Sequence, residues 1–407
     1  MDSLTQIILG AAVGEVILGK RIGNRAMVWG AVGGTIPDLD ILANAVMPEI
    51  EALAFHRAIS HSFFFSLTGP LLFAWLARSW YRAGWRHRPA YPYLKLGIWL
   101  LAYLILTAVV SAITLYFSGE KGLVATLLLV VAGVVVFKKY FRDQILAFAT
   151  ESQGPSAVSY RSWYWLFFGA FFTHILLDVC TTYGTQIFQP FSNYRSALSS
   201  IAVVDPADTV PCLFCLILSS WQARGTRWRR RWNWIGIITS SLYLIFTMFN
   251  KAHVNEVWRQ TLSAHNLSWQ RIFTSPTLFN NILWHTIAEA DSVYYQGDYA
   301  LTDHLKAVKI RDTLVKNHHL LTPYALAQPV KILTWFSHGY YAVTPVAENT
   351  WHVCDLRYGG GVAGEACVMG FIVTVGPNGE VSVKGQRPEM DDVKGAFRQL
   401  GQRLKGE

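Results

Sequence analysis

Long apolar runs alternate with short polar stretches over the first 250 residues of the chain. A helix needs roughly 20 apolar residues to cross a bilayer, and most of the runs approach that length. Two shorter runs precede them, at 5–19 and 26–36. As helices these rise only about 22 Å and about 16 Å, so they either cross a thinned region or form a short hairpin inside the bundle. The longer runs are 62–80, 96–117, 122–137, 162–180, 208–223 and 232–249.

Beyond residue 250 the apolar runs shorten and alternate with polar residues, which is typical of strands with one buried face. Helical patterns lie near 302–315, 322–337 and 390–405, and Pro377-Asn378-Gly379 predicts a hairpin turn. The sequence therefore predicts an α-helical integral membrane bundle of about 6–8 membrane segments in residues 1–250, followed by a small α+β extramembrane domain in residues 251–407. The predicted strands are "ILWHTIAEADSVYYQGDYAL", "GYYAVTP", "NTWHVCDLRYG", "ACVMGFIVTV" and "EVSVKG".

The composition agrees with a membrane protein, since 52% of the 407 residues are hydrophobic and only 15% are charged. The net charge of +9 comes largely from clusters beside apolar runs, such as "RSWYRAGWRHR" and "RGTRWRRR". Clusters in such places anchor helices at the membrane surface, so the positive charge does not indicate a nucleic-acid partner.

The basic loops fall on alternate sides of the predicted segments, and short loops rich in Lys and Arg stay cytoplasmic. This pattern predicts a multi-pass protein whose N-terminus and whose domain after residue 250 lie outside the cytoplasm. Cys354 and Cys367 lie on predicted strands of that domain, where an oxidising compartment permits either a disulfide or two free thiols. The four basic loops hold Lys20, Arg21 and Arg25; Arg78, Arg82, Arg86, Arg88 and Lys95; Lys138, Lys139, Arg142 and Arg161; and Arg224, Arg227, Arg229, Arg230 and Arg231.

Four separated stretches place carboxylates, imidazoles and other polar groups at the predicted outer ends of the apolar segments. Ionisable groups at membrane depth are costly, so they normally face the bundle interior and mark a site. Taken singly, each stretch has a plainer explanation, as a solvated loop carboxylate, an interfacial histidine or a hydrogen-bonded structural pair. Their convergence on one membrane face favours a shared site. The residues are Asp2 and Gln6; Asp38 and Asp40; His56, Arg57, His61 and Ser62; and His174 and Asp178.

His174 and Asp178 occupy positions i and i+4, so both lie on one face of a helix and can hold one metal ion. His56 and His61 diverge on a continuous helix, but a helix start at Ser60 lets His56 turn back from the loop. Imidazole and carboxylate ligands suit Zn²⁺, and also Mn²⁺ or Fe²⁺. The set has more such groups than one tetrahedral ion needs, so it could hold two metals, an arrangement that supports phosphoester hydrolysis.

The stretches "MDSLTQIILGAAVGE", "GGTIPDLD", "HRAISHS" and "FFTHILLD" occur in an order that resembles the YdjM-like proteins, inner-membrane metal-dependent hydrolases also labelled LexA-binding. The resemblance covers roughly the first 200 residues. It implies a location in the bacterial inner (cytoplasmic) membrane and a distant kinship with zinc-dependent phospholipase C and P1-type nucleases, and contact with LexA follows from the label alone. The metal ligands that it implies are His61, His174, Asp178 and one of Asp38 or Asp40, with His56 and Arg57 close by.

The chain departs from that family at Thr5-Gln6, where many members have Thr-His. A glutamine cannot supply an imidazole ligand, so one metal position is lost unless Asp2 or Glu15 compensates.

We therefore expect a membrane-bound metal-dependent hydrolase that uses a metal-activated water at the outer membrane face. The expected partners are membrane lipid and a phosphoester substrate, either a lipid or an envelope metabolite. Asp38 or Asp40 binds the metal, His56 is a ligand or proton shuttle, and Arg57 stabilises charge on the phosphoryl group. The alternative is a divalent-cation transporter or a non-catalytic metal-binding scaffold. Transport sites tend to lie near the midplane on broken helices, whereas these residues lie at segment ends, which favours the hydrolase.

Overall fold

The structure is a computed structural model, and it describes residues 1–83, 158–359, 367–386 and 400–405 with the single positions 103, 104, 107, 131 and 133. The chain divides into two compact units, one made of Met1–Leu71 with Tyr164–Glu407 and the other of Leu72–Trp163. All of the candidate site residues belong to the first unit. The predicted segments 96–117 and 122–137 lie outside the described residues except for those single positions.

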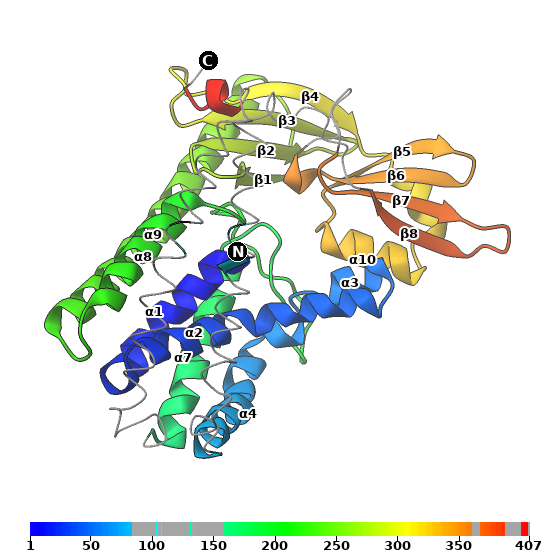
Figure 1. The fold of residues 1–407 in the computed structure, drawn as a ribbon. Helices are drawn as coiled ribbons and strands as arrows, with labels where there is room; N and C mark the ends of the chain where they lie inside the picture. Colours follow the sequence, from blue (N-terminus) through cyan, green and yellow to red (C-terminus); the bar gives the residue numbers. More distant parts are fainter. Residues whose placement is uncertain are drawn as a thin grey trace. The chain divides into compact units, whose positions relative to one another are not determined.

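Two helices at the N-terminus form a tight hairpin, α1 (Ser3–Ile22) and α2 (Asn24–Thr35), which lie side by side in Figure 1. Asp2 caps α1, because its side chain accepts a hydrogen bond from the Thr5 backbone N–H at 3.1 Å. Glycine permits the close approach of the two helices, since a Cβ on Gly14 would lie 2.2 Å from the Ala26 carbonyl oxygen. The two apolar runs therefore pair as a hairpin, and α1 is longer than the predicted run 5–19 and is itself long enough to cross a membrane.

The next elements carry most of the candidate site. They are the 3₁₀ helix η1 (Pro37–Ala45), α3 (Glu49–Phe55), the 3₁₀ helix η2 (Ile59–His61), α4 (Phe63–Arg82) and α7 (Tyr160–Val179). The segment from α3 to η2 meets α4 at a bend of 68°. Helices α8 (Pro206–Trp221) and α9 (Arg227–Ala264) then pack against each other and against α1.

Within the described residues, α1 and α9 are long and apolar enough to cross a membrane, and a third span results if the bent segment from α3 to α4 counts as one. Helix α8 is apolar, but its 16 residues are fewer than a spanning helix needs. The described part of the chain thus forms a helical region with two or three candidate spans and does not support the predicted count of about 6–8. Two of the predicted segments fall outside it.

The chain after α9 forms two antiparallel four-stranded sheets, in the orders β1-β2-β3-β4 and β5-β6-β7-β8 (Figure 1). Gly379, in the turn from β7 to β8, has a φ of 79°, a conformation that glycine adopts without strain. The predicted turn there is confirmed. The strands are β1 (Arg271–Pro276), β2 (Leu283–Glu289), β3 (Val293–Ala300), β4 (Lys309–Val315), β5 (Tyr341–Ala347), β6 (Thr350–Asp355), β7 (Gly370–Val375) and β8 (Val381–Gln386).

The helical predictions for this region were partly wrong. The run 302–315 ends in strand β4, because its side chains alternate between exposed and half-buried, which is the period of a strand. The run 322–337 divides into the 3₁₀ helix η6 (His318–Tyr324) and helix α10 (Gln328–Phe336). Most of 390–405 lies outside the described residues.

Two hydrophobic cores join the helices to the sheets. Ile50 of α3 packs with Leu333 of α10 and Phe371 of the second sheet, and the Glu49 side chain accepts a hydrogen bond from the Gly385 N–H at 2.9 Å. On the first sheet, Trp258 of α9 belongs to a separate cluster with strand residues. Helix α9 runs to Ala264, past the domain boundary that the sequence predicts at residue 250. The contacts of α3 hold the segment that leads to His61 against the second sheet.

Cys354 and Cys367 form a disulfide, with Cα atoms 5.8 Å apart. This confirms the first of the two alternatives for these residues. Cys180, Cys212 and Cys215 are free thiols, and all three are buried in the helical region.

Candidate metal centre

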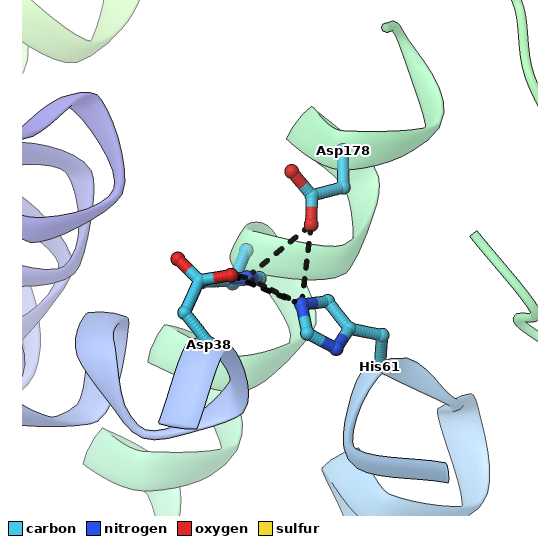
Figure 2. A group of neighbouring side chains, drawn as sticks. Asp38, His61 and Asp178 are labelled. Atoms are coloured by element: carbon cyan, nitrogen blue, oxygen red, sulfur yellow. Dashed lines mark hydrogen bonds and ion pairs between the residues drawn. The ribbon is translucent and has the colours of Figure 1, made fainter. Parts of the chain in front are cut away.

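Four side chains from three elements converge on one point in the first compact unit. Asp38 extends from the first turn of η1, directly after Pro37 begins that helix. His61 ends η2, while His174 and Asp178 lie one turn apart on α7. Figure 2 shows Asp38, His61 and Asp178 pointing toward one another, with dashed lines between their polar atoms. The ligand atoms of all four residues lie within 4.8 Å of one another, so they could hold one metal ion.

The separations between these atoms match a single tetrahedral ion. His61 Nε2 lies 3.1 Å from His174 Nε2 and 3.4 Å from Asp178 Oδ2. The distance from His174 Nε2 to the same Asp178 oxygen is 3.3 Å. Asp38 Oδ1 lies 3.3 Å from His61 Nε2 and 3.5 Å from His174 Nε2. Ligands that each lie about 2.0–2.1 Å from a tetrahedral ion are about 3.3 Å apart, so five measured edges agree with that geometry.

Polar contacts at Nδ1 orient both imidazole rings. His174 Nδ1 lies 2.8 Å from the Gly34 carbonyl oxygen, which can only accept, so Nδ1 carries the hydrogen. His61 Nδ1 lies 3.3 Å from Asp40 Oδ2 and 3.0 Å from the Ser60 hydroxyl. With a metal ion bound, each ring would direct an Nε2 lone pair at the centre, the arrangement in which a second partner fixes a metal-binding histidine.

Asp178 supplies a further sign that this group of residues fits a metal ion. Its Oδ2 is buried and accepts no hydrogen bond, although both Nε2 atoms lie close to it. Its Oδ1, by contrast, accepts from Gln6 Nε2 at 3.0 Å and also contacts the Met1 amino group. A buried carboxylate oxygen without a donor is costly, and a metal ion at this point would satisfy it. The residues therefore fit a divalent ion.

Asp40 supports the centre from outside, so Asp38 is the carboxylate of the "PDLD" stretch that joins the group. Asp40 accepts hydrogen bonds from the Arg57 N–H at 2.8 Å and the Ser60 hydroxyl at 3.1 Å, and His56 Nδ1 lies 2.8 Å away. Burial raises the pKa of Asp40, but its hydrogen bonds with His56 and His61 outweigh burial and hold the pKa below its usual range. Asp40 therefore stays ionised as the partner of the His61 ring.

Asp38 itself is also held as a carboxylate. Burial raises its pKa, but hydrogen bonds with His174 and His61 have the larger combined effect and hold the pKa below its usual range. The Asp38 side chain is 17% exposed, whereas the other three ligand side chains are at most 1% exposed. Asp38 is therefore the ligand of the four with the most contact with solvent.

A break in the helix explains how His56 and His61 lie near one another. Helix α3 ends at Phe55, His56 is extended, and Arg57 has a φ of 58°, in the left-handed region that costs a non-glycine residue about 1 kcal/mol. The rings of His56 and His61 then lie 6.1 Å apart instead of diverging. The broken-helix alternative is confirmed, but its break lies at His56 and Arg57 instead of at Ser60. His56 is a partner of Asp40 and is not one of the four grouped ligands.

Arg57 is turned inward, against a ligand of the centre. Its guanidinium lies 3.2 Å from Asp178 Oδ1, donates a hydrogen bond to Thr181 Oγ1 at 3.1 Å and packs 5.0 Å from the Tyr183 ring centroid. Only 5% of the residue is exposed, so it is not an anchor at the lipid headgroups. The Nε atom of Arg57 is buried and has no hydrogen-bond acceptor.

The remaining predicted accessory residues have separate roles. Gln6 donates to Asp178, as above, and to the His174 carbonyl oxygen at 3.2 Å, so it orients a ligand of the centre. Asp2 caps α1, and the Ser62 hydroxyl accepts from the Phe65 N–H at the start of α4. Glu15 does not reach the centre, because Arg229 binds its carboxylate with two charged hydrogen bonds of 2.6 Å and 2.5 Å. The prediction that Glu15 supplies the ligand that Gln6 cannot is therefore wrong.

Sequence reasoning missed two residues beside the centre, Tyr183 and Arg195. Arg195 is 1% exposed, and it donates hydrogen bonds to the carbonyl oxygens of His56 at 2.6 Å and Tyr183 at 3.2 Å. Its guanidinium also packs 5.2 Å from the Phe336 ring of α10. Arg195 thus links the loop that carries His56 to the C-terminal part. The sequence offered one signal for Arg195, which is the lone basic residue of the loop 181–207.

The donor set combines nitrogen and oxygen ligands. Two imidazole nitrogens and two carboxylate oxygens suit Zn²⁺, Mn²⁺ or Fe²⁺. Among the described residues the ligand atoms form one such group, so a second metal position has no counterpart there.

A family model described as YdjM inner membrane protein matches this chain over residues 1–119 and 99–254. All four residues of the centre lie within the matched stretches. No curated protein and no solved structure matches the chain.

Proposed function

Because this chain belongs to the YdjM inner membrane protein family, we propose that its Asp–His centre makes it a membrane-bound metal-dependent hydrolase. The observation that carries the proposal is the convergence of Asp38, His61, His174 and Asp178 at separations that suit one divalent ion. The proposed substrate is a phosphoester of a lipid or an envelope metabolite. A membrane location favours a lipid, because a lipid headgroup is already concentrated at the surface where the protein lies.

The metal ion and the protein residues have separate roles in the proposed hydrolysis. When bound, a divalent ion acidifies a water molecule to give the nucleophile and neutralises charge on a phosphoryl oxygen. Asp38, which is partly exposed, leaves room on its side for water and substrate. Arg57 holds Asp178 in place through its Oδ1. His56 is half-buried and bound to Asp40, so it can take up or release a proton at its Nε2 atom.

A non-catalytic metal-binding scaffold is the second candidate, and one specific observation favours it. Four protein ligands complete a tetrahedral shell, whereas catalytic zinc sites usually keep a position for water. Hydrolysis at this centre therefore needs a fifth position or displacement of Asp38. A cation transporter is disfavoured, because the fixed charge of Arg57 lies 3.2 Å from a ligand oxygen and repels a passing ion.

The test is a screen of the purified full-length protein against p-nitrophenyl phosphate, bis-p-nitrophenyl phosphate and phospholipid vesicles. The proposal expects hydrolysis of at least one phosphoester that stops when a chelator removes the metal and returns when Zn²⁺ or Mn²⁺ is added back. Metal-loaded protein without activity on any of the three would favour the scaffold.

We also propose that the centre and the C-terminal part face the outside of the inner membrane. The alternation of basic loops supports this orientation, and the Cys354–Cys367 disulfide is typical of an oxidising compartment. Alkaline phosphatase fused after Gly119 or after Asn266, beyond the end of α9, should be active. Fusions after Arg88 or Arg230 should be silent. The reverse activity pattern would place the centre in the cytoplasm.

A further inference from the structure

A groove of about 710 Å³ lies between α3, α10 and the loop that follows α7. Its volume falls within the range of about 300–1,000 Å³ that is usual for small-molecule sites. None of the four residues of the metal centre lines it, so it is a separate feature of the first compact unit.

The polar lining of the groove is rich in amides and carries one charge of each sign. The amides are held in a network, because Gln186 Nε2 donates to the Ala54 carbonyl oxygen at 2.8 Å and Gln189 Nε2 donates to Gln186 Oε1 at 3.0 Å. Glu51 and Lys331 are exposed and form no ion pair with each other or with any other described residue. The groove therefore offers a cationic donor and an anionic acceptor to a ligand.

The other side of the groove is apolar and leads to a candidate membrane span. Ile59 lines the groove and lies just before α4, and the Phe63 N–H donates to the Ile187 carbonyl oxygen at 3.0 Å. Phe64 of α4 contacts Phe191 with ring centroids 6.2 Å apart, and Phe191 is 84% exposed. The bent segment from α3 to α4 is a candidate span, so the exposed rings of Phe64 and Phe191 add apolar surface beside that span.

We infer that the groove binds one zwitterionic phospholipid, with the phosphate at Lys331 and the amide donors, the headgroup ammonium at Glu51, and the acyl chains over Ile59, Phe64 and Phe191. Both charges of the groove are then matched, whereas an anionic phospholipid without an ammonium leaves Glu51 unpaired. The inference rests on the membrane location of the family and not on hydrolysis.

The test uses delipidated full-length protein in neutral detergent, titrated with dioleoyl phosphatidylethanolamine and followed by native mass spectrometry. One lipid should bind saturably. Lys331→Glu should weaken that binding by about tenfold, because the change replaces the cation that attracts the phosphate with an anion that repels it. Glu51→Gln should remove the preference for phosphatidylethanolamine over dioleoyl phosphatidylglycerol. Lys309→Glu, the same charge change on exposed strand β4, should leave binding unchanged.

Metal content and thermal unfolding of each variant show that the fold is intact. Three results would overturn the inference. The first is a statistical series of weakly bound lipids without one saturable site, and the second is an affinity of Lys331→Glu equal to that of wild type. The third is that free phosphoethanolamine displaces the bound lipid at the same concentration that whole competing lipid requires. The last would mean that the groove recognises a soluble headgroup and not a phospholipid.

Discussion

Purified protein carrying both His61→Ala and His174→Ala is expected to contain no bound divalent ion after dialysis, whereas wild-type protein retains one. These two changes remove both nitrogen ligands of the centre and leave only Asp38 and Asp178. Loss of a residue that merely orients a ligand lowers metal affinity by about 10–100-fold, so loss of two ligands lowers it further. Elemental analysis of the dialysed proteins measures the result.

A matched control makes the same two His→Ala substitutions at positions away from the centre. His265 and His319 are exposed and lie in the cap of α9 and in η6, so His265→Ala with His319→Ala should retain the wild-type metal content. Thermal unfolding gives a second readout, because an ion that binds only the folded state raises the midpoint temperature. A chelator should lower the midpoint of wild type and of the control but not that of the His61, His174 variant. Full metal occupancy in that variant would contradict the assignment of these ligands.

Arg57→Lys is expected to keep the metal and lower turnover by about 10–100-fold, because Arg57 orients a metal ligand. Arginine fixes Asp178 Oδ1 and Thr181 Oγ1 with separate nitrogens of one planar group, which a single ammonium cannot reproduce. The positive charge beside Asp178 persists in the lysine variant, so the carboxylate should remain a ligand. The measurement is turnover on the phosphoester found in the screen, together with metal content.

Arg259→Lys provides the control, since Arg259 is half-exposed and its ion pair with Glu256 lies on the surface of α9. Its turnover should equal that of wild type. If Arg57→Lys also retained full turnover, Arg57 would be only a packing residue. If it lost the metal, the positive charge that lysine retains would not be enough to keep Asp178 in place as a ligand.

The parts of this site that follow helical periodicity could be predicted from the sequence. His174 and Asp178 are four residues apart in an apolar run, and an uninterrupted helix places them on one face. The apolar runs 5–19 and 26–36 similarly predicted two short helices, which the structure contains as α1 and α2. In each case a local repeat determines which side chains lie together.

The choices that depend on irregular backbone could not be predicted. Asp38 and Asp40 are both in η1, and only the folded position of His61 decides which of them joins the centre. The left-handed conformation of Arg57 separates α3 from η2, and no residue preference announces it, because left-handed residues other than glycine are uncommon. Arg195 comes from a loop without periodicity and reaches His56 only through the tertiary fold.

The region of strand β4 was wrongly predicted to be helical. The residues before Lys309 contain charged and apolar side chains that suit a helix, and the alternation typical of a strand begins only at residue 309. Pairing with β3, from Val293 with Val315 to Asp298 with Lys309, then fixes the strand. Long-range pairing of this kind is not encoded in a window of neighbouring residues.

The most direct test of a hydrolytic metal centre is a titration of metal-free protein with Zn²⁺ or Mn²⁺ in which bound metal and phosphoester turnover are measured on the same samples. Turnover should rise in proportion to occupancy and reach its plateau at about one ion per chain, because the four ligand atoms surround one position. Full occupancy with no turnover on any phosphoester would contradict the account and leave a metal-binding scaffold.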